Sequence, residues 1–290
     1  MSDYKINIIL FAIPFFALSV ILEAVYNYYK KYDYYESKDA IASLSMGIGN
    51  AIIRQWTPWA YLPLYYFLYD NYRVFELNNQ YLAWILIIFA DDFSYYWFHR
   101  ASHKCRYLWA SHVIHHSSKK YNLSTALRQT WTGKITTPLI FWSWMPIMGF
   151  HPMMIVLMKS INLIYQFWIH TEIISKMPKF FEVIFNTPSH HRVHHGSDVI
   201  YVDKNYAGIF IIWDKLFGTF QPEMQRPNYG LMHNIDTYNP LRIATHEWLS
   251  IFKDIKIKNT LLNNMKYIFS PPGWSQDNST KTIEQIRNKI

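Results

Sequence analysis

Cysteine is almost absent from this chain of 290 residues, in which Cys105 is the single example. One cysteine excludes a disulfide scaffold and any zinc or iron–sulfur site built from several thiolates. Charged residues make up only 17% of the chain and aromatic residues 19%, which excludes a disordered or linker protein. Histidine is missing from the first 98 residues, yet eleven of the 13 histidines lie between His99 and His195. The composition therefore predicts imidazole chemistry in the middle of an apolar chain.

Four long apolar runs predict an integral membrane protein, because about 20 apolar residues are enough to cross the hydrocarbon core of a bilayer. Three of them cover residues 6–26, 40–69 and 81–98. The second contains Pro58 and Pro63, which predicts a kinked or tilted span or a re-entrant segment. The fourth, 135–170, predicts a hairpin of two spans that turns near Gly149 and Pro152. We therefore expect an all-α, polytopic membrane protein of about five spans with a cytoplasmic helical cap that carries the histidine clusters.

The distribution of Lys and Arg predicts the orientation, because short cytoplasmic loops carry an excess of positive charge. With the N-terminus outside and five alternating spans, the inner segments are 27–39, 99–134 and 171–290. These hold 24 Lys and Arg residues, whereas the outer segments hold only Lys5 and Arg73. Two crossings by residues 40–69 would move 99–134 outside, so one crossing is preferred. The net charge of +8 then reflects a cytoplasmic face against anionic headgroups rather than nucleic-acid binding. The alternative is a soluble helical protein with a very aromatic core.

Three groups of histidines have a helical spacing that predicts a metal site. The groups are HxxxH (His99, His103), HxxHH (His112, His115, His116) and a second HxxHH (His191, His194, His195). Side chains three or four residues apart lie on one face of a helix, one turn apart. Neutral imidazole is a common ligand of zinc, copper and iron. A single HxxxH pair also occurs by chance on helix surfaces, but three such groups provide enough nitrogen for two metal ions.

Other polar residues near these groups are candidates for supporting roles. Asp92 lies two helical turns before His99, where its carboxylate could accept a hydrogen bond from a ligand histidine; the alternative is an ion pair with Arg54. Glu172, close to His170, is a candidate ligand or base, with a solvated interfacial charge as the alternative. His190 could be a ligand or a neighbour of one. His151, His233 and His246 are expected to be ordinary surface or turn residues.

The histidine groups resemble those of the membrane-bound fatty acid hydroxylase superfamily, which includes sterol desaturases and C4-methyl sterol oxidases. The segment from Trp213 to Thr219 matches the WD-x-x-FGT tail of that family. Within it, the chain is most similar to the alkylglycerol monooxygenase branch, whose members cleave ether lipids with tetrahydrobiopterin. The runs that carry this similarity lie between residues 85 and 275 and include YYWFHR (95–100), QFWIHTE (166–172), NTPSHHRVHHG (186–196) and KNYAG (204–208).

The resemblance implies nine metal ligands: His99, His103, His112, His115, His116, His170, His191, His194 and His195. His190 is a further candidate, and Asp92 and Glu172 are the candidate catalytic residues. Two positions depart from the related patterns. Lys104 follows His103, where alkylglycerol monooxygenases are expected to have an acidic residue, and Gln166 stands where fatty acid 2-hydroxylases have a further histidine.

The resemblance also implies a function and a domain plan. We expect a non-haem di-iron monooxygenase that uses O2 and two external electrons to hydroxylate a membrane lipid at the ether carbon of an alkylglycerol. Tetrahydrobiopterin or a redox protein would supply the electrons. One domain would cover residues 1–290: spans 1–3 in 1–98, the first two histidine groups in 99–134, a membrane hairpin in 135–170, and the third group and cytoplasmic tail in 171–290.

Two other functions fit the same histidine groups. One is a hydroxylase or desaturase of a fatty acyl, sterol or carotenoid chain, and the other is a zinc-stabilised membrane protein without enzymatic activity. In each case the histidine groups are expected on the cytoplasmic face of a bacterial inner membrane or of the endoplasmic reticulum.

Overall fold

A computed structural model describes residues 8–132, 136–257 and 260–289 of the chain. Within these ranges the protein is all-α, and its only β pairings are two isolated bridges, Phe185 with Phe210 and Gly196 with Tyr229. The expectation of a helical protein is therefore confirmed. The starts of two predicted spans, at Ile6 and Ile135, lie outside the described residues.

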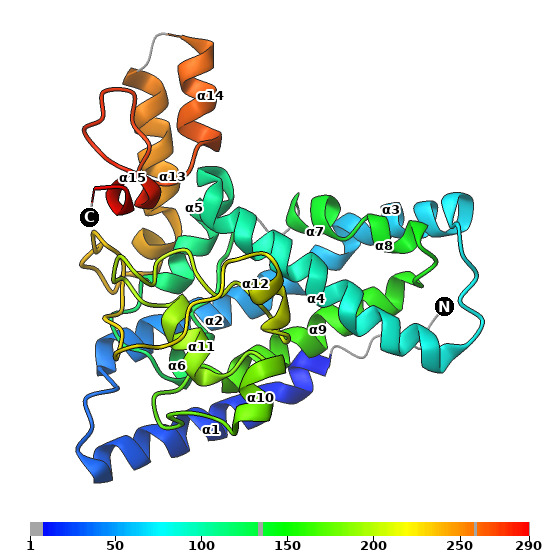
Figure 1. The fold of residues 1–290 in the computed structure, drawn as a ribbon, viewed down its shortest axis with the longest axis horizontal. Helices are drawn as coiled ribbons and strands as arrows, with labels where there is room; N and C mark the ends of the chain where they lie inside the picture. Colours follow the sequence, from blue (N-terminus) through cyan, green and yellow to red (C-terminus); the bar gives the residue numbers. More distant parts are fainter. Residues whose placement is uncertain (1–7, 133–135, 258–259, 290) are drawn as a thin grey trace.

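Five long helices form the body of the molecule (Figure 1). They are α1 (Ile8–Lys30), α2 (Ser37–Arg54), α3 (Thr57–Tyr72), α4 (Gln80–Lys104) and α9 (Pro152–Trp168). Helix α4 packs against α9, and α9 packs against both α1 and α3. Asn79 begins α4, because its side chain accepts a hydrogen bond from the backbone N–H of Leu82 at 3.1 Å.

The apolar run 40–69 is divided between two helices. Helix α2 ends at Arg54, and α3 begins at Thr57, whose hydroxyl donates a hydrogen bond to the Arg54 carbonyl at 2.9 Å. Pro58 in the first turn of α3 suits the start of a helix, where a missing N–H costs nothing. Helix α3 continues in the direction of α2, so the interruption is a kink rather than a reversal (Figure 1).

The run 135–170 reverses direction near Gly149, as its sequence predicts, but its first arm is not one helix. Short helices α7 (Thr136–Phe141) and α8 (Trp144–Ile147) precede the turn, and α9 follows it. Gly149 has a φ of +94°, and an added Cβ would lie 2.1 Å from the Phe75 carbonyl oxygen, so only glycine fits this position. The first arm is therefore too short and interrupted for the full span that the run predicts.

The remaining helices form a cap at one end of the long helices (Figure 1). They are α5 (Arg106–His116), α6 (Leu123–Ala126), α10 (Lys179–Ile184), α11 (Pro188–His194), α12 (Ile212–Leu216), α13 (Pro240–Ile257), α14 (Leu261–Phe269) and α15 (Ile283–Arg287). Helix α5 follows α4 after the single residue Cys105 and packs against it, and α13 and α14 pack on α5. The first two histidine groups therefore meet at the junction of body and cap.

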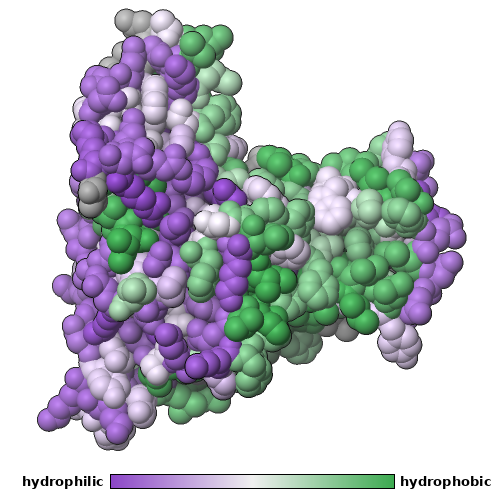
Figure 2. All heavy atoms as spheres, in the orientation of Figure 1, coloured by the Kyte–Doolittle hydropathy of each residue, from purple (hydrophilic) through white to green (hydrophobic). Residues whose placement is uncertain are grey.

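The surface separates into a hydrophobic body and a hydrophilic cap (Figure 2). Large apolar side chains are exposed on the body, among them Trp59 at 70%, Tyr81 at 85% and Ile85 at 56% exposure. A hydrophilic rim closes the far end of the body. Among the described residues, one helical segment, Phe11–Lys30, is both long and apolar enough by itself to cross a bilayer.

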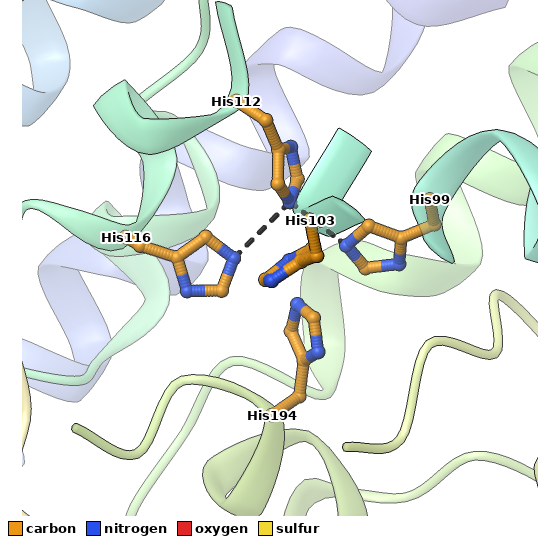
Figure 3. A group of neighbouring side chains, drawn as sticks. All are labelled: His99, His103, His112, His116 and His194. Carbon is orange, nitrogen blue, oxygen red and sulfur yellow. Dashed lines mark hydrogen bonds between the residues drawn. The ribbon is translucent and has the colours of Figure 1, made fainter. Parts of the chain in front are cut away.

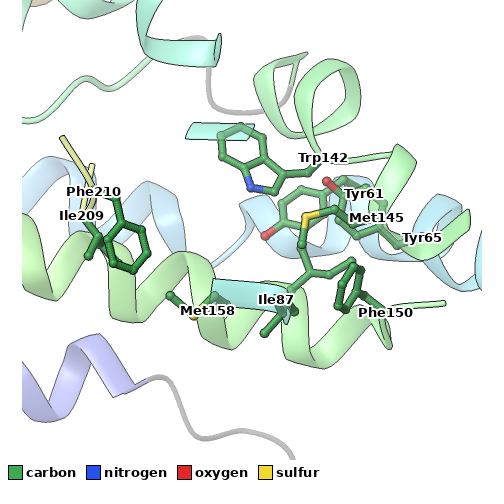
Figure 4. Close-up of a cluster of buried hydrophobic side chains, with 10 residues drawn as sticks. Tyr61, Tyr65, Ile87, Trp142, Met145, Phe150, Met158, Ile209 and Phe210 are labelled. Carbon is green, nitrogen blue, oxygen red and sulfur yellow. The ribbon is translucent and has the colours of Figure 1, made fainter. Parts of the chain in front are cut away.

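The interior of the body is an aromatic and aliphatic cluster (Figure 4). It joins α3, α4, α8 and α9 to the loop before α12 through Tyr61, Tyr65, Ile87, Trp142, Met145, Phe150, Ile155, Met158, Ile209 and Phe210. A buried polar contact lies within it, where the Trp142 indole N–H donates to Asp91 at 2.7 Å. This packing fixes α4 against α9, the two helices whose ends carry His99, His103 and His170.

Candidate metal centre

Five histidines from three helices converge on one point at the junction of body and cap (Figure 3). Helix α4 contributes two, α5 two and α11 one: His99, His103, His112, His116 and His194. One nitrogen of each lies within 4.8 Å of a nitrogen of every other member. We call these residues the five-histidine cluster.

Four further histidines form a second group beside the first. His115 comes from α5, His170 lies two residues after the end of α9, and His191 and His195 lie at α11 and its C-terminal cap. Their ligand nitrogens also lie within 4.8 Å of one another. The rings of His116 and His195 stack across the boundary, with centroids 4.4 Å apart. We call this second group the four-histidine cluster.

Helical geometry explains how each HxxHH group serves both clusters. Along a helix, the fourth residue is rotated about 40° one way and the third about 60° the other way. His112 and His116 therefore face the five-histidine cluster, while His115 faces the other. In α11 the division is reversed, because His191 and His195 join the four-histidine cluster and His194 joins the first.

Backbone carbonyls hold several imidazoles by Nδ1, so that Nε2 is directed into the clusters. His99 is held by the Tyr206 carbonyl at 2.7 Å, His170 by Gln166 at 2.7 Å and His194 by Lys204 at 3.0 Å. His115 is held by the Arg128 carbonyl at 3.3 Å. A hydrogen bond of this kind fixes both the tautomer and the orientation of a histidine that binds a metal.

Several of the described cluster nitrogens are buried without a hydrogen-bond partner, which suits them to bind a metal ion. Among the described residues, the Nε2 atoms of His103, His194 and His195 are buried without a hydrogen-bond partner. Leaving such atoms unpaired costs about 1–3 kcal/mol each, and a metal ion would remove that cost. The Nε2 atoms of His99 and His116 both approach that of His112, at 2.9 and 3.1 Å.

Burial keeps these imidazoles neutral, which is the form that binds metals. It lowers the pKa of His112, His116 and His194 well below the usual 6.5, and neighbouring imidazoles lower the pKa of each further. Burial also lowers the pKa of His115 to about 4. At neutral pH these four imidazoles therefore present unprotonated nitrogens.

Asp203 contacts the five-histidine cluster and was missed by the sequence analysis. Its carboxylate, only 8% exposed, accepts from His103 Nδ1 at 3.3 Å and pairs with Lys104 Nζ at 2.9 Å. Burial acts to raise the pKa of Asp203, but the bond from His103 and the charge of Lys104 outweigh it and lower the pKa. The one available signal was position, since Asp203 directly precedes the KNYAG run. Lys104 also pairs with Glu284 at 2.7 Å, which ties α15 to the cluster.

Asp92 does not contact a ligand histidine, contrary to the prediction. Its carboxylate accepts from the backbone N–H groups of Ile209 and Phe210 at 2.6 and 2.9 Å, and from the indole N–H of Trp213 at 3.0 Å. Among the described ion pairs there is none between Arg54 and Asp92, and the Arg54 guanidinium donates instead to the Ser160 hydroxyl at 3.3 Å. Asp92 therefore fixes the loop that carries Tyr206, whose carbonyl orients His99.

Glu172 and His190 lie outside both clusters. The Glu172 carboxylate pairs with Arg226 at 3.2 Å and lines a separate cavity. His190 Nε2 lies 3.1 Å from the Glu182 carboxylate, so it contributes to the packing around α11. His151 accepts from the Met153 N–H at the start of α9, and His233 is exposed. The nine histidines in the clusters are the same nine that the resemblance implies as ligands.

Comparisons with known proteins identify a family domain within this chain. Residues 84–219 match the model of the fatty acid hydroxylase family, so this chain contains a domain of that family. All nine cluster histidines fall within the matched segment. The resemblance inferred from the histidine groups is therefore confirmed.

Individual curated relatives are similar to this chain over half of its length or more. The alkylglycerol monooxygenase of Homo sapiens is 41% identical over 266 residues, which cover 91% of this chain and 59% of that protein. The alkylglycerol monooxygenase of Caenorhabditis elegans is 36% identical over 254 residues, covering 83% and 50%. Lathosterol oxidase of Homo sapiens is 27% identical over 164 residues, covering 52% and 48%. The chain thus spans less than two thirds of each of these relatives, and no solved structure matches it.

Proposed function

We propose that this chain is a membrane-bound, O2-dependent lipid monooxygenase whose two histidine clusters hold two iron ions. The observation that carries the proposal is the convergence of nine buried imidazoles in two adjacent groups. Their setting within a fatty acid hydroxylase domain supports it. When bound, a di-iron centre supplies the activation of O2 that an unactivated C–H bond requires.

The protein's own residues hold and orient this centre. Carbonyls of Tyr206, Gln166 and Lys204 aim three imidazoles, and Asp203 aims His103. The ligands come from α4, α5, α9 and α11, so the packing of body against cap sets the spacing of the two clusters. Buried surroundings keep bulk water away from the site, which favours oxidation of the lipid over side reactions.

The bilayer would surround the apolar body, with the cap on the cytoplasmic side. The hydrophobic belt of Figure 2 supports this placement, as does the excess of Lys and Arg in 99–134 and 171–290. Residues 1–290 would then form one hydroxylase domain, with about five membrane-inserted segments of which α7 and α8 together enter only part of the bilayer. A lipid chain would approach the clusters from the body, and a soluble reductant from the cap.

The substrate we propose is an alkylglycerol lipid, on the identity to alkylglycerol monooxygenases over 91% of the chain. Hydroxylation of the ether carbon gives a hemiacetal, which separates into an aldehyde and a glycerol lipid. The second oxygen atom of O2 leaves as water, so a donor must supply two electrons and two protons. We propose tetrahydrobiopterin as that donor.

Lys104 forms ion pairs with Asp203 and Glu284, so in this chain it contributes to the packing around His103.

Lipid product analysis tests the proposal. Membranes from cells that express the chain, given labelled alkylglycerol, tetrahydrobiopterin and air, should release a labelled fatty aldehyde that membranes without the chain do not. If the membranes instead form a hydroxylated or desaturated acyl, sterol or carotenoid product and no aldehyde, ether cleavage is refuted and the chain is a hydroxylase or desaturase of that lipid. A stable protein with bound zinc, no iron and no turnover would contradict an enzymatic role.

A matched pair of histidine variants tests the ligand assignment. His115→Ala should abolish metal loading of the four-histidine cluster and product formation while leaving membrane insertion intact. His233→Ala, at an exposed histidine outside both clusters, should behave as the wild type. Normal iron content and activity in His115→Ala would refute the assignment.

A further inference from the structure

Helix α14 of the cap carries an exposed apolar face. Leu261 and Leu262 are 80% and 65% exposed, and Met265 and Phe269 are 46% and 50% exposed. At 3.6 residues per turn, these four positions fall within one face of the helix that is about 100° wide. Tyr267 on the other side is buried, and α5 and α13 pack against α14. The helix is therefore held from one side and presents large apolar side chains on the other.

The direction of α14 relative to the body matches the surface of a bilayer. The helix lies on the side of the cap from which the body extends, and its axis runs across the direction of α4 and α9 (Figure 1). Hydrophobic atoms gather along the edge of this part of the cap that faces the body side, whereas its opposite edge is hydrophilic (Figure 2). A bilayer that surrounds the body and ends at the cap would therefore have α14 lying along its surface.

The charge of the helical hairpin formed by α13 and α14 also suits a lipid surface. Residues 240–269 contain five Lys and Arg residues but only two acidic residues, Glu247 and Asp254. Both carboxylates pair with Arg106 of α5, each at 2.6 Å, so they are already neutralised within the protein. Lys266 is exposed beside the apolar face, where a lysine can extend its amine to the headgroups while its methylenes cover apolar surface. Anionic lipids attract such basic segments.

Arg106 joins the hairpin to the metal centre. It is the first residue of α5, and its guanidinium pairs with two carboxylates of α13. Its backbone N–H donates to the carbonyl of Ser270, the residue directly after α14, at 3.1 Å. Helix α5 carries three of the nine cluster histidines. The position of α14 in a bilayer would therefore fix the height of α5 above the lipid.

We infer that α14 is a surface anchor that lies in the headgroup layer next to the cap, with its apolar face in the same bilayer that surrounds the body. The inference rests on the membrane placement given under the proposed function. With nine residues, α14 is too short to cross the hydrocarbon core. An amphipathic helix that lies in the interface instead buries its apolar face about 5–10 Å into the boundary between headgroups and acyl chains.

Single-cysteine labelling of the iron-loaded full chain tests the anchor. Cys105→Ser removes the native thiol, and Leu262→Cys or Met265→Cys then places a fluorophore on the apolar face. Asn263→Cys is the matched control on another side of the same helix, where the native amide donates to Gln276 at 2.8 Å. The chain is reconstituted in vesicles of three parts phosphatidylcholine to one part phosphatidylglycerol. A nitroxide-bearing lipid should quench both labels on the apolar face several-fold more strongly than the control label, and aqueous iodide should show the reverse order.

The outcomes separate this inference from the alternatives and from the proposed function. Equal quenching of all three labels by the nitroxide lipid, or equal access of iodide to all three, would overturn the inference. Labels shielded from both quenchers, together with cross-linking between Leu262→Cys chains on oxidation in detergent, would show that a second copy covers the face, and would also overturn it. Iron content should stay at the wild-type level in every variant, and two labelled positions keep the test valid if one variant does not fold. Because quenching requires no turnover, failure of the wild type to load iron would refute the proposed function alone.

Discussion

Removing the Asp203 carboxylate should weaken the five-histidine cluster selectively. The carboxylate is nearly buried and accepts from His103 Nδ1 at 3.3 Å, so Asp203→Ala leaves that ring without its orienting partner. Loss of a group that orients a metal ligand costs 10- to 100-fold in metal affinity, or about 1.4–2.8 kcal/mol. Asp203→Asn keeps an acceptor at the same position and should fall between this variant and the wild type.

Chelator competition on the iron-loaded chain provides the assay. At a chelator concentration that leaves both ions on the wild type, Asp203→Ala should retain one, because the four-histidine cluster has no contact with Asp203 among the described bonds. Glu284→Ala is the matched control, since it breaks the other ion pair of Lys104 without touching His103. Equal retention of both ions by Asp203→Ala and the wild type would refute the role assigned to this residue.

Three further outcomes follow from the buried contacts. Asp92→Ala leaves the N–H groups of Ile209 and Phe210 without acceptors and should lower the free energy of unfolding by about 2–6 kcal/mol; an unchanged thermal midpoint in detergent would contradict this. Arg128→Met breaks a buried ion pair with Asp39, at 3.2 Å, and should lower the free energy of unfolding by about 3–5 kcal/mol in a denaturant titration. Lys119→Met, which breaks an exposed pair, should lower it by less than about 1 kcal/mol. The metal-free chain should lose stability as the pH falls from 6.5 toward 4, because unfolded imidazoles with the usual pKa bind protons that the buried imidazole of His115, with a pKa of about 4, does not. An equal thermal midpoint at pH 7 and pH 5 would argue against that linkage.

Eight of the nine cluster histidines could be identified from the sequence because their spacing is local, whereas His170 was implied only by the family resemblance. A helix converts the separation of His112 from His116 directly into a shared face. The same rule turns His115 away from His112 and His116 on the helix, but it does not show which histidines from elsewhere in the chain His115 joins. That division depends on where His170 and α11 lie, which only the packing of body and cap determines.

The role of Asp92 could not be predicted for the same reason. Its helical register with His99 is correct, but register does not reveal which groups approach from elsewhere in the chain. Ile209 and Phe210, more than a hundred residues away in the sequence, donate their backbone N–H groups to the carboxylate, which therefore contacts them instead of a histidine. Asp203 shows the converse, since only tertiary packing brings it to His103.

The long helices could be predicted where a hydrophobic run forms one continuous helix. They could not be predicted where the chain leaves the helix within a run. The run 81–98 predicts α4 well, although the helix continues to Lys104 and so carries His99 and His103. The run 135–170 predicts a hairpin of two spans, but the chain leaves the helix at Trp142 and Ser143. There the Trp142 indole donates to Asp91, a contact between distant segments that hydropathy does not encode.

The most direct test of the central claim is the iron content of the purified chain and of one variant in each cluster. The account predicts two iron ions per wild-type chain, and about one in His194→Ala and in His170→Ala, which alter the five-histidine and four-histidine clusters respectively. An iron content of two in either variant, or of zero in a wild-type chain reconstituted with ferrous iron, would contradict it.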